Sequence, residues 1–260
     1  MYYRMLMGAI FWLSLSVHAI TIEPIPKDIS VSRALYVNCL QRTQTQQLLK
    51  SYILSGMDLK YKNPKKELAE AIGKYDERLQ SLHRFFQARI TQKEVKEKLT
   101  KALLTWTESS MILKTSPKKS KVLVLQKNFK EIISLLSSAK VLAKKSFKAV
   151  GLTGGLCREP FYISNLYFMK TWGVDIEVYE KKIEAHREKF NHNIAELEKY
   201  EGNTPEIKQH IIEAKKAFAR MNRYIDHSKR AFVPSLISQK ANQIFVHIRT
   251  IKKLYGEQLK

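Results

Sequence analysis

The chain has 260 residues, enough for one or two domains, and 44% of them are hydrophobic, as in folded globular proteins rather than disordered ones. Its net charge of +22 favours an anionic partner, such as anionic membrane lipid or a small oxyanion; the alternative is that the lysines only solvate the helix surfaces. The lysines are spread over all parts of the chain instead of forming a stripe with interleaved aromatic residues, which argues against nucleic acid as that partner.

The first 19 residues have the pattern of a signal peptide. A short basic segment that ends at Arg4 precedes an apolar run over residues 5–17, and Val17-His18-Ala19 predicts cleavage after Ala19. Removal of Arg4 lowers the net charge from +22 to +21. An uncleaved anchor helix is the alternative, although the apolar run is shorter than the roughly 20 residues that a membrane span needs. We therefore expect a periplasmic protein.

Apolar residues recur at helical spacing in the first half of the remaining chain. After an extended lead over 20–29, the pattern predicts helices over about 30–55, from Asn63-Pro64, from a capping box at Thr91-Gln-Lys-Glu94, and after the break at Ser116-Pro117. The only glycine cluster, Gly151-Leu-Thr-Gly-Gly155, is interpreted as the boundary between two domains.

Four further helices are predicted after that cluster. They run from about Leu156 to Trp172-Gly173, from Tyr179 to beyond Leu197, from Asn203-Thr204-Pro205-Glu206, and over the stripe from Leu236 to Leu254. Runs of alternating polarity typical of strands are absent, so the predicted fold class is all-α.

The two halves share one order of elements. Leu125, Ile132, Leu136 and Leu142 align with Ile237, Ile244, Ile248 and Leu254 at a constant offset of 112 residues. We therefore predict two tandem antiparallel four-helix bundles, one over residues 20–150 and one over 151–260.

The segment from Cys39 to Tyr52 places polar residues on a helix that its apolar flanks predict to be buried. Gln41, Arg42, Gln44, Gln46 and Gln47 fall within about two turns. A second, weaker match to this polar pattern runs from Gly155 to Phe168, and it aligns Arg158 with Arg42. Buried groups of this kind need partners from the protein, from water or from a ligand.

Gln41, Arg42, Gln46, Lys50 and Tyr52 carry a resemblance to a known family. The pattern resembles the first-helix motif of the NarX-like nitrate/nitrite sensor domain, and more closely its relative, the PilJ-type N-terminal domain of chemotaxis transducers. In nitrate-sensing members the arginine that matches Arg42 binds the anion where two first helices meet. The guanidinium fork suits this task because it donates paired hydrogen bonds to a planar oxyanion.

The resemblance implies a ligand-binding set of Arg42, Arg158, Gln41 and Gln46, with both arginines supplied by one polypeptide. The alternative is that both arginines only pair with carboxylates or solvent, and Glu159 beside Arg158 is a candidate for such pairing.

The sequence indicates no catalytic or cofactor site. The two cysteines, Cys39 and Cys157, lie near the starts of the two halves and could form a bridge, but they fit neither a covalent haem motif nor a zinc site. His186 falls on an apolar stripe and is interpreted as a core residue. We expect a protein that is not an enzyme and has no metal or cofactor.

Two functions remain as hypotheses. The first is an exported sensory module that binds a small oxyanion and signals through a separate partner, such as a membrane receptor or an envelope protein. The second is a non-catalytic helical scaffold or adaptor in the cell envelope. The oligomeric state is left open.

Export can be tested directly. The N-terminal sequence of the exported protein is expected to begin at Ile20, because cleavage follows Ala19. Exported material that begins at Met1 would contradict the prediction of a cleaved signal peptide.

Overall fold

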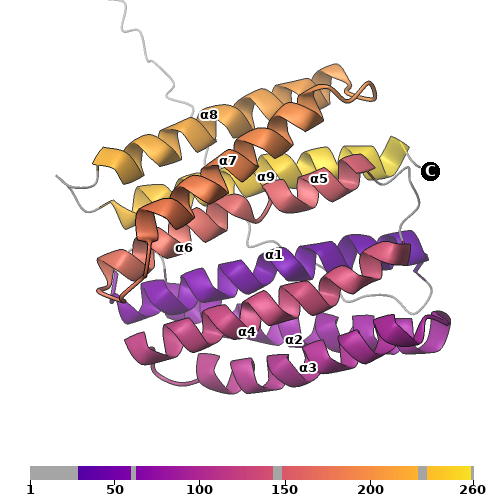
Figure 1. Cartoon of the computed structure of the whole chain (residues 1–260), viewed down its shortest axis with the longest axis horizontal. Helices are drawn as coiled ribbons and strands as arrows, with labels where there is room; N and C mark the ends of the chain where they lie inside the picture. The colour runs from indigo at the N-terminus through magenta and orange to yellow at the C-terminus, as the bar shows by residue number, and fades with distance from the viewer. Residues whose placement is uncertain (1–28, 60–62, 143–147, 228–232, 259–260) are drawn as a thin grey trace, which may run out of the picture.

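The computed structural model describes residues 29–59, 63–142, 148–227 and 233–258, and Figure 1 draws them as ribbons. In these ranges the chain is all-helical and contains no strand, which confirms the predicted fold class. The predicted signal peptide and nearly all of the extended lead lie outside the described residues.

The helices of the first half follow the predicted breaks. They are α1 (Val31–Gly56), α2 (Pro64–Arg89), α3 (Lys93–Leu113) and α4 (Lys119–Ser137), and α4 continues into a 3₁₀ helix, η1 (Ser138–Leu142). The second half contains α5 (Lys148–Leu156), α6 (Glu159–Thr171), α7 (Tyr179–Glu198), α8 (Pro205–His227) and α9 (Pro234–Gln258).

Side-chain caps explain where two helices begin. The Asn63 side chain accepts a hydrogen bond from the backbone N–H of Lys66 at 3.0 Å, and Pro64 then occupies the first helical position. Thr204 caps α8 by accepting from the N–H of Ile207 at 3.2 Å. The predicted capping box at Thr91 is wrong, because α3 begins at Lys93, after Gln92, and its cap residue makes no side-chain hydrogen bond.

The helices form two groups that meet along α1. In the N-terminal group (α1–α4 and η1), α1 packs on α2 and α4, and α3 packs on the same two helices. In the C-terminal group (α5–α9), α5 and α6 follow one another end to end and pack on α7 and α9, while α8 packs on α9. Contacts of α1 with α6 and α5 join the two groups, as Figure 1 shows.

The glycine cluster lies inside α5 instead of in a linker. A Cβ atom at Gly154 would come within 2.5 Å of the Cys39 sulfur, so the missing side chain lets α5 approach α1 this closely. A Cβ atom at Gly155 would meet the Asn193 amide nitrogen at 2.9 Å. These two glycines therefore serve close helix packing, and the break in the helix comes later, at Cys157 and Arg158.

Buried apolar side chains form one continuous cluster that includes both groups. The predicted stripe of α2 is buried along its length: Leu68, Ile72, Tyr75, Leu79, Leu82 and Phe86. One prediction at the end of the α9 stripe is wrong, because Leu236 is 39% exposed, whereas Leu254 at the other end is half-buried and packs against the core. Helix ends have fewer neighbouring residues than helix centres, which explains why an apolar side chain at the end of the stripe is less buried than the pattern predicts.

None of the described helices combines the length and the apolar character needed to cross a membrane.

Two core truncations test the packing. Leu79 on α2 is fully buried and Ile194 on α7 is 3% exposed. Leu79→Ala and Ile194→Ala are each expected to lower the free energy of unfolding by about 2–5 kcal/mol, because each leaves a cavity. The two side chains lie in different groups, so the effects should add in the double variant when measured by urea denaturation. A strong coupling between them would show that the groups unfold as one tightly coupled core.

Candidate functional site

The polar segment of α1 is buried because neighbouring helices surround it. α1 packs on α2 and α4 on one side and on α6 and α5 on the other. Nine polar residues of this helix are consequently buried: Asn38, Gln41, Arg42, Thr43, Thr45, Gln46, Lys50, Ser51 and Ser55. Each of them must find a partner inside the protein or leave a polar atom unpaired at a cost in stability.

Gln41 and Gln46 hold neighbouring helices against α1. The Gln41 amide nitrogen donates to the backbone carbonyl of Tyr75 on α2 at 3.0 Å. Asn165 on α6 donates its amide nitrogen to the Gln46 backbone carbonyl at 3.0 Å and to the Gln46 side-chain oxygen at 3.3 Å. Both glutamines, which the resemblance assigns to ligand binding, thus make contacts between helices.

Arg42 lies between the two groups and is only 5% exposed. Its Nη1 donates to the Ser137 hydroxyl at the end of α4 at 2.8 Å. Its Nη2 lies 3.9 Å from where a Cβ of Gly154 would be, which places the guanidinium beside α5. Its Nε is buried and has no hydrogen-bond partner among the described residues. None of the described carboxylates forms an ion pair with Arg42.

Arg158 occupies the turn between α5 and α6 and is half-buried. Its Nη1 is buried without a hydrogen-bond partner in the described part of the chain. The structure brings the two predicted arginines into one electrostatic neighbourhood. Burial lowers the pKa of Arg42, the negative charge of the neighbouring Cys39 sulfur opposes this, and the positive charge of Arg158 lowers the pKa further.

Glu159 forms its ion pairs with residues other than Arg158, so the pairing of these two neighbours that the sequence suggested is wrong. Its carboxylate is fully buried; it accepts a hydrogen bond from His186 Nδ1 at 2.6 Å and forms an ion pair with Lys189 Nζ at 3.0 Å, both on α7. Burial tends to raise the pKa of Glu159, but the contacts with His186 and Lys189 hold it below its ordinary value. The Tyr162 ring stacks on His186, with ring centroids 4.7 Å apart.

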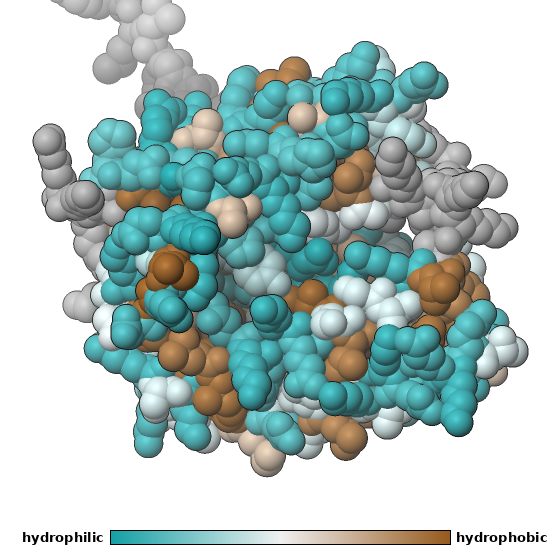
Figure 2. All heavy atoms as spheres, viewed as in Figure 1, coloured by the Kyte–Doolittle hydropathy of each residue, from teal (hydrophilic) through white to brown (hydrophobic). Residues whose placement is uncertain are grey.

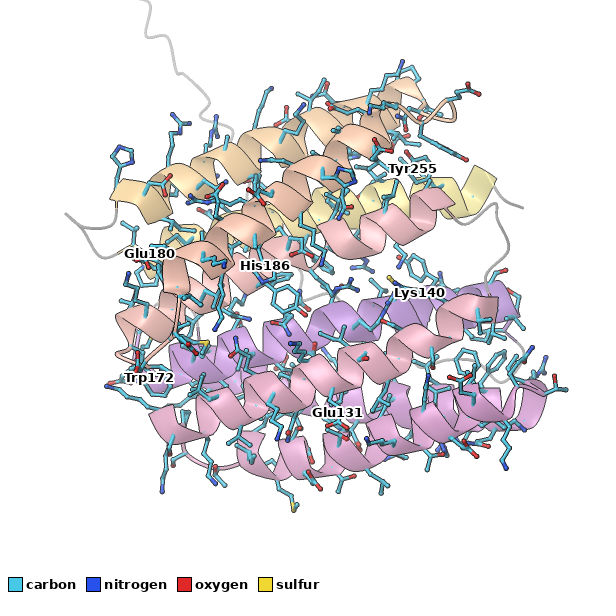
Figure 3. All side chains as sticks on the ribbon, in the orientation of Figure 1. Glu131, Lys140, Trp172, Glu180, His186 and Tyr255 are labelled. Atoms are coloured by element: carbon cyan, nitrogen blue, oxygen red, sulfur yellow. The ribbon has the colours of Figure 1, made fainter. Side chains whose placement is uncertain are left out.

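Lys140 on η1 is a third cation of this neighbourhood, and no motif in the sequence pointed to it. Burial and the positive charges of Arg42 and Arg158 lower the pKa of Lys140. Its side chain remains exposed, and Figure 3 labels Lys140 and His186 where the two groups face each other. We name Arg42, Lys140 and Arg158 the cation cluster.

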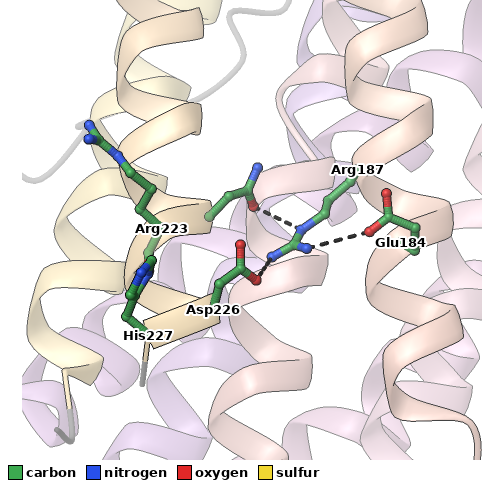
Figure 4. A network of polar contacts seen from close by, with 6 residues as sticks. Glu184, Arg187, Arg223, Asp226 and His227 are labelled. Carbon is green, nitrogen blue, oxygen red and sulfur yellow. Dashed lines mark hydrogen bonds and ion pairs between the residues drawn. The ribbon is translucent and has the colours of Figure 1, made fainter. Parts of the chain in front are cut away.

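Arg187 shows how a fully paired arginine is held in this protein. It bonds to Asn222 at 3.2 Å, Asp226 at 2.6 Å and Glu184 at 3.4 Å, and so ties α7 to α8 (Figure 4). The cation cluster has no such carboxylate partner among the described residues, and the Cys39 sulfur beside Arg42 offsets only one of its three positive charges.

The two cysteines are unbonded and buried, and their environments differ. Burial tends to raise the pKa of Cys39, but the positive charges of Lys252 and Arg42 outweigh burial and lower it to about 6. Burial raises the pKa of Cys157 to about 12. The lowered pKa favours the thiolate form of Cys39, whereas the raised pKa of Cys157 favours the thiol.

No family model matches the chain, and neither the curated proteins nor the solved structures contain a match.

The Cys39 thiolate predicts a pH-dependent stability. Between pH 6 and 9 the unfolded chain holds a proton on Cys39 that the folded chain lacks, so the free energy of unfolding should rise with pH. This stabilisation is complete above pH 9 and is lost as the pH falls through 6. Urea denaturation across this range should show the slope in the parent protein and a smaller slope in Cys39→Ser.

Cys157→Ser is the matched control. Since burial raises the pKa of Cys157 instead of lowering it, this variant should keep the slope between pH 6 and 9. An unchanged slope in Cys39→Ser would show that Cys39 is not ionised in the folded protein.

Proposed function

We propose that this protein is an exported, non-catalytic sensory module that binds a small oxyanion between its two helical groups. One observation carries the proposal: two buried guanidinium nitrogens, Arg42 Nε from the N-terminal group and Arg158 Nη1 from the C-terminal group, have no acceptor among the described residues. An anion placed between them supplies the missing acceptors and the missing negative charge.

The energetics favour such a ligand. A buried donor left unpaired costs about 1–3 kcal/mol, and more when the group is charged. The two arginines and Lys140 also repel one another, and this repulsion adds to burial in lowering the pKa values of Arg42 and Lys140. An oxyanion turns this repulsion into attraction, and guanidinium groups bind oxyanions with paired, charge-assisted hydrogen bonds.

The arrangement of helices supports a further proposal about architecture. The N-terminal and C-terminal groups correspond to two tandem antiparallel four-helix bundles, with α5 and α6 together standing for one interrupted helix. Each bundle contributes one arginine, Arg42 or Arg158, so the chain forms an internal equivalent of the arginine pair that the NarX-like and PilJ-type resemblance implies. Ligand binding would then alter how the bundles pack, and this change in packing would be transmitted to a membrane receptor or an envelope protein in the periplasm.

A second candidate function is a scaffold or adaptor, and exposed apolar side chains favour it. Leu104 and Met111 on α3 are 63% and 59% exposed, and Leu123 and Val124 on α4 are 46% and 41% exposed. The face in Figure 2 is otherwise mostly hydrophilic, with separate hydrophobic areas. Such side chains suit contact with another protein, and this contact does not require an anion.

Anion binding is tested by the melting temperature. Because a ligand that binds only the folded state stabilises it, nitrate, nitrite, sulfate or a carboxylate should raise the melting temperature in a concentration-dependent way. Arg158→Gln should abolish this shift and leave the helical content unchanged, since Arg158 is half-buried and donates to no acceptor from Nη1. Arg42→Ala should abolish it as well.

Arg220→Gln is the matched control, because Arg220 is exposed on α8 and its loss changes the net charge equally. It should melt and respond to anions like the parent protein. If the melting temperature of the parent protein is independent of all four kinds of anion, the oxyanion proposal is wrong and the scaffold function is the better account.

A further inference from the structure

The charges around the cation cluster do not balance. The nearby Lys189 is already paired, because its ammonium lies 3.0 Å from the Glu159 carboxylate. The Cys39 sulfur interacts with Arg42 and with Lys252, which is fully buried and also lies over the Tyr36 ring at 4.5 Å, so it offsets one of these two positive charges. With these contacts counted, the four cations Arg42, Lys140, Arg158 and Lys252 face one anionic sulfur among the described residues, which leaves three positive charges in excess.

The three cations approach from three separate elements. Arg42 comes from α1, Lys140 from η1 and Arg158 from the start of α6. The contact of Arg42 with Ser137 at 2.8 Å fixes its guanidinium at the end of α4, from which η1 and Lys140 continue. The other side of the Arg42 guanidinium lies against α5, because Nη2 is 3.9 Å from the position of a Cβ atom on Gly154. Gly154 precedes Arg158 by four residues. The cluster therefore rests on packing as well as on charge.

We propose that the site prefers a free, doubly charged tetrahedral oxyanion, such as sulfate or hydrogenphosphate, over singly charged nitrate or nitrite, and that Lys140 sets this preference. The inference rests on the proposed function, since it names the class of anion for the same site.

Charge favours the dianion. Three cations around a monoanion leave two positive charges uncompensated, whereas a dianion leaves one. At separations of a few ångströms in a partly buried site, each additional unit of ligand charge is worth more than about 1 kcal/mol, or roughly tenfold in affinity. Geometry favours a tetrahedral ion for a separate reason. Donors from three elements can reach different oxygens of a tetrahedron, and the lysine ammonium is a compact charge that adapts to an oxygen outside the plane of a guanidinium.

Lys140 offers a clean test because its side chain is exposed, so its replacement should not disturb the core. Arg42 is less suitable because it is buried and bonds to Ser137. Lys130 on α4 provides the matched control, since it is also exposed and its replacement removes the same charge from the same end-to-end helical element outside the cluster.

The experiment is isothermal titration calorimetry of the full chain with sulfate, perchlorate, nitrate and glycerol 3-phosphate at constant ionic strength. Perchlorate has the tetrahedral shape of sulfate with one charge fewer, so the ratio of the two affinities isolates the effect of charge. The parent protein and Lys130→Gln should bind sulfate at least about tenfold more tightly than perchlorate. In Lys140→Gln this ratio should fall to about threefold or less, while perchlorate still binds.

Each outcome separates the inference from the function on which it rests. If nitrate or perchlorate binds as tightly as sulfate, the site binds anions but the preference for a dianion is wrong. If Lys140→Gln keeps the parent ratio, Lys140 does not set the preference. If the ratio of sulfate to perchlorate affinity also falls in Lys130→Gln, the overall charge of the protein explains the selectivity. Tighter binding of glycerol 3-phosphate than of sulfate would show that the ligand is a phosphate ester rather than a free ion. Binding of none of these anions would overturn the proposed function itself.

Discussion

The burial of a polar helix is the constraint on which the rest of the structure depends. α1 joins the two helical groups and is surrounded by other helices, so little of its surface faces solvent. Nine of its polar residues are consequently buried. The surrounding helices meet this demand with amide-to-carbonyl bonds such as those of Gln41 and Asn165. Since these bonds run from α1 to α2 and to α6, the same interactions that satisfy the buried groups also hold both groups in register.

The apolar framework was predictable from the sequence, because stripes at helical spacing depend mainly on local pattern. The starts of α2 and α8 were predictable for the same reason, since Asn63-Pro64 and Thr204-Pro205 satisfy the helix end within a few residues. The capping box predicted at Thr91 does not form, although the residue types match the motif, because α3 begins one residue later than the motif requires.

The candidate site was predictable only in part. The matching positions of Arg42 and Arg158 suggested that they belong together, and the structure places them within electrostatic reach of each other. The partners of each polar group were not predictable, because they come from distant parts of the chain. Glu159 adjoins Arg158 in sequence but pairs with His186 and Lys189 on α7, and Lys140 enters the site from η1 without any motif. Adjacency along a chain therefore predicts poorly which charges neutralise each other.

The absence of a side chain at Gly154 has a consequence for how this sequence can vary. A Cβ atom there would lie 2.5 Å from the Cys39 sulfur and 3.9 Å from an Arg42 nitrogen, so the volume available at position 154 depends on the size of residue 39. A larger residue at 154 requires a smaller one at 39, or a shift of α5 away from α1 that would separate the arginines. In descendants of this sequence, positions 39 and 154 should therefore change together as long as the two halves of the protein stay in close contact.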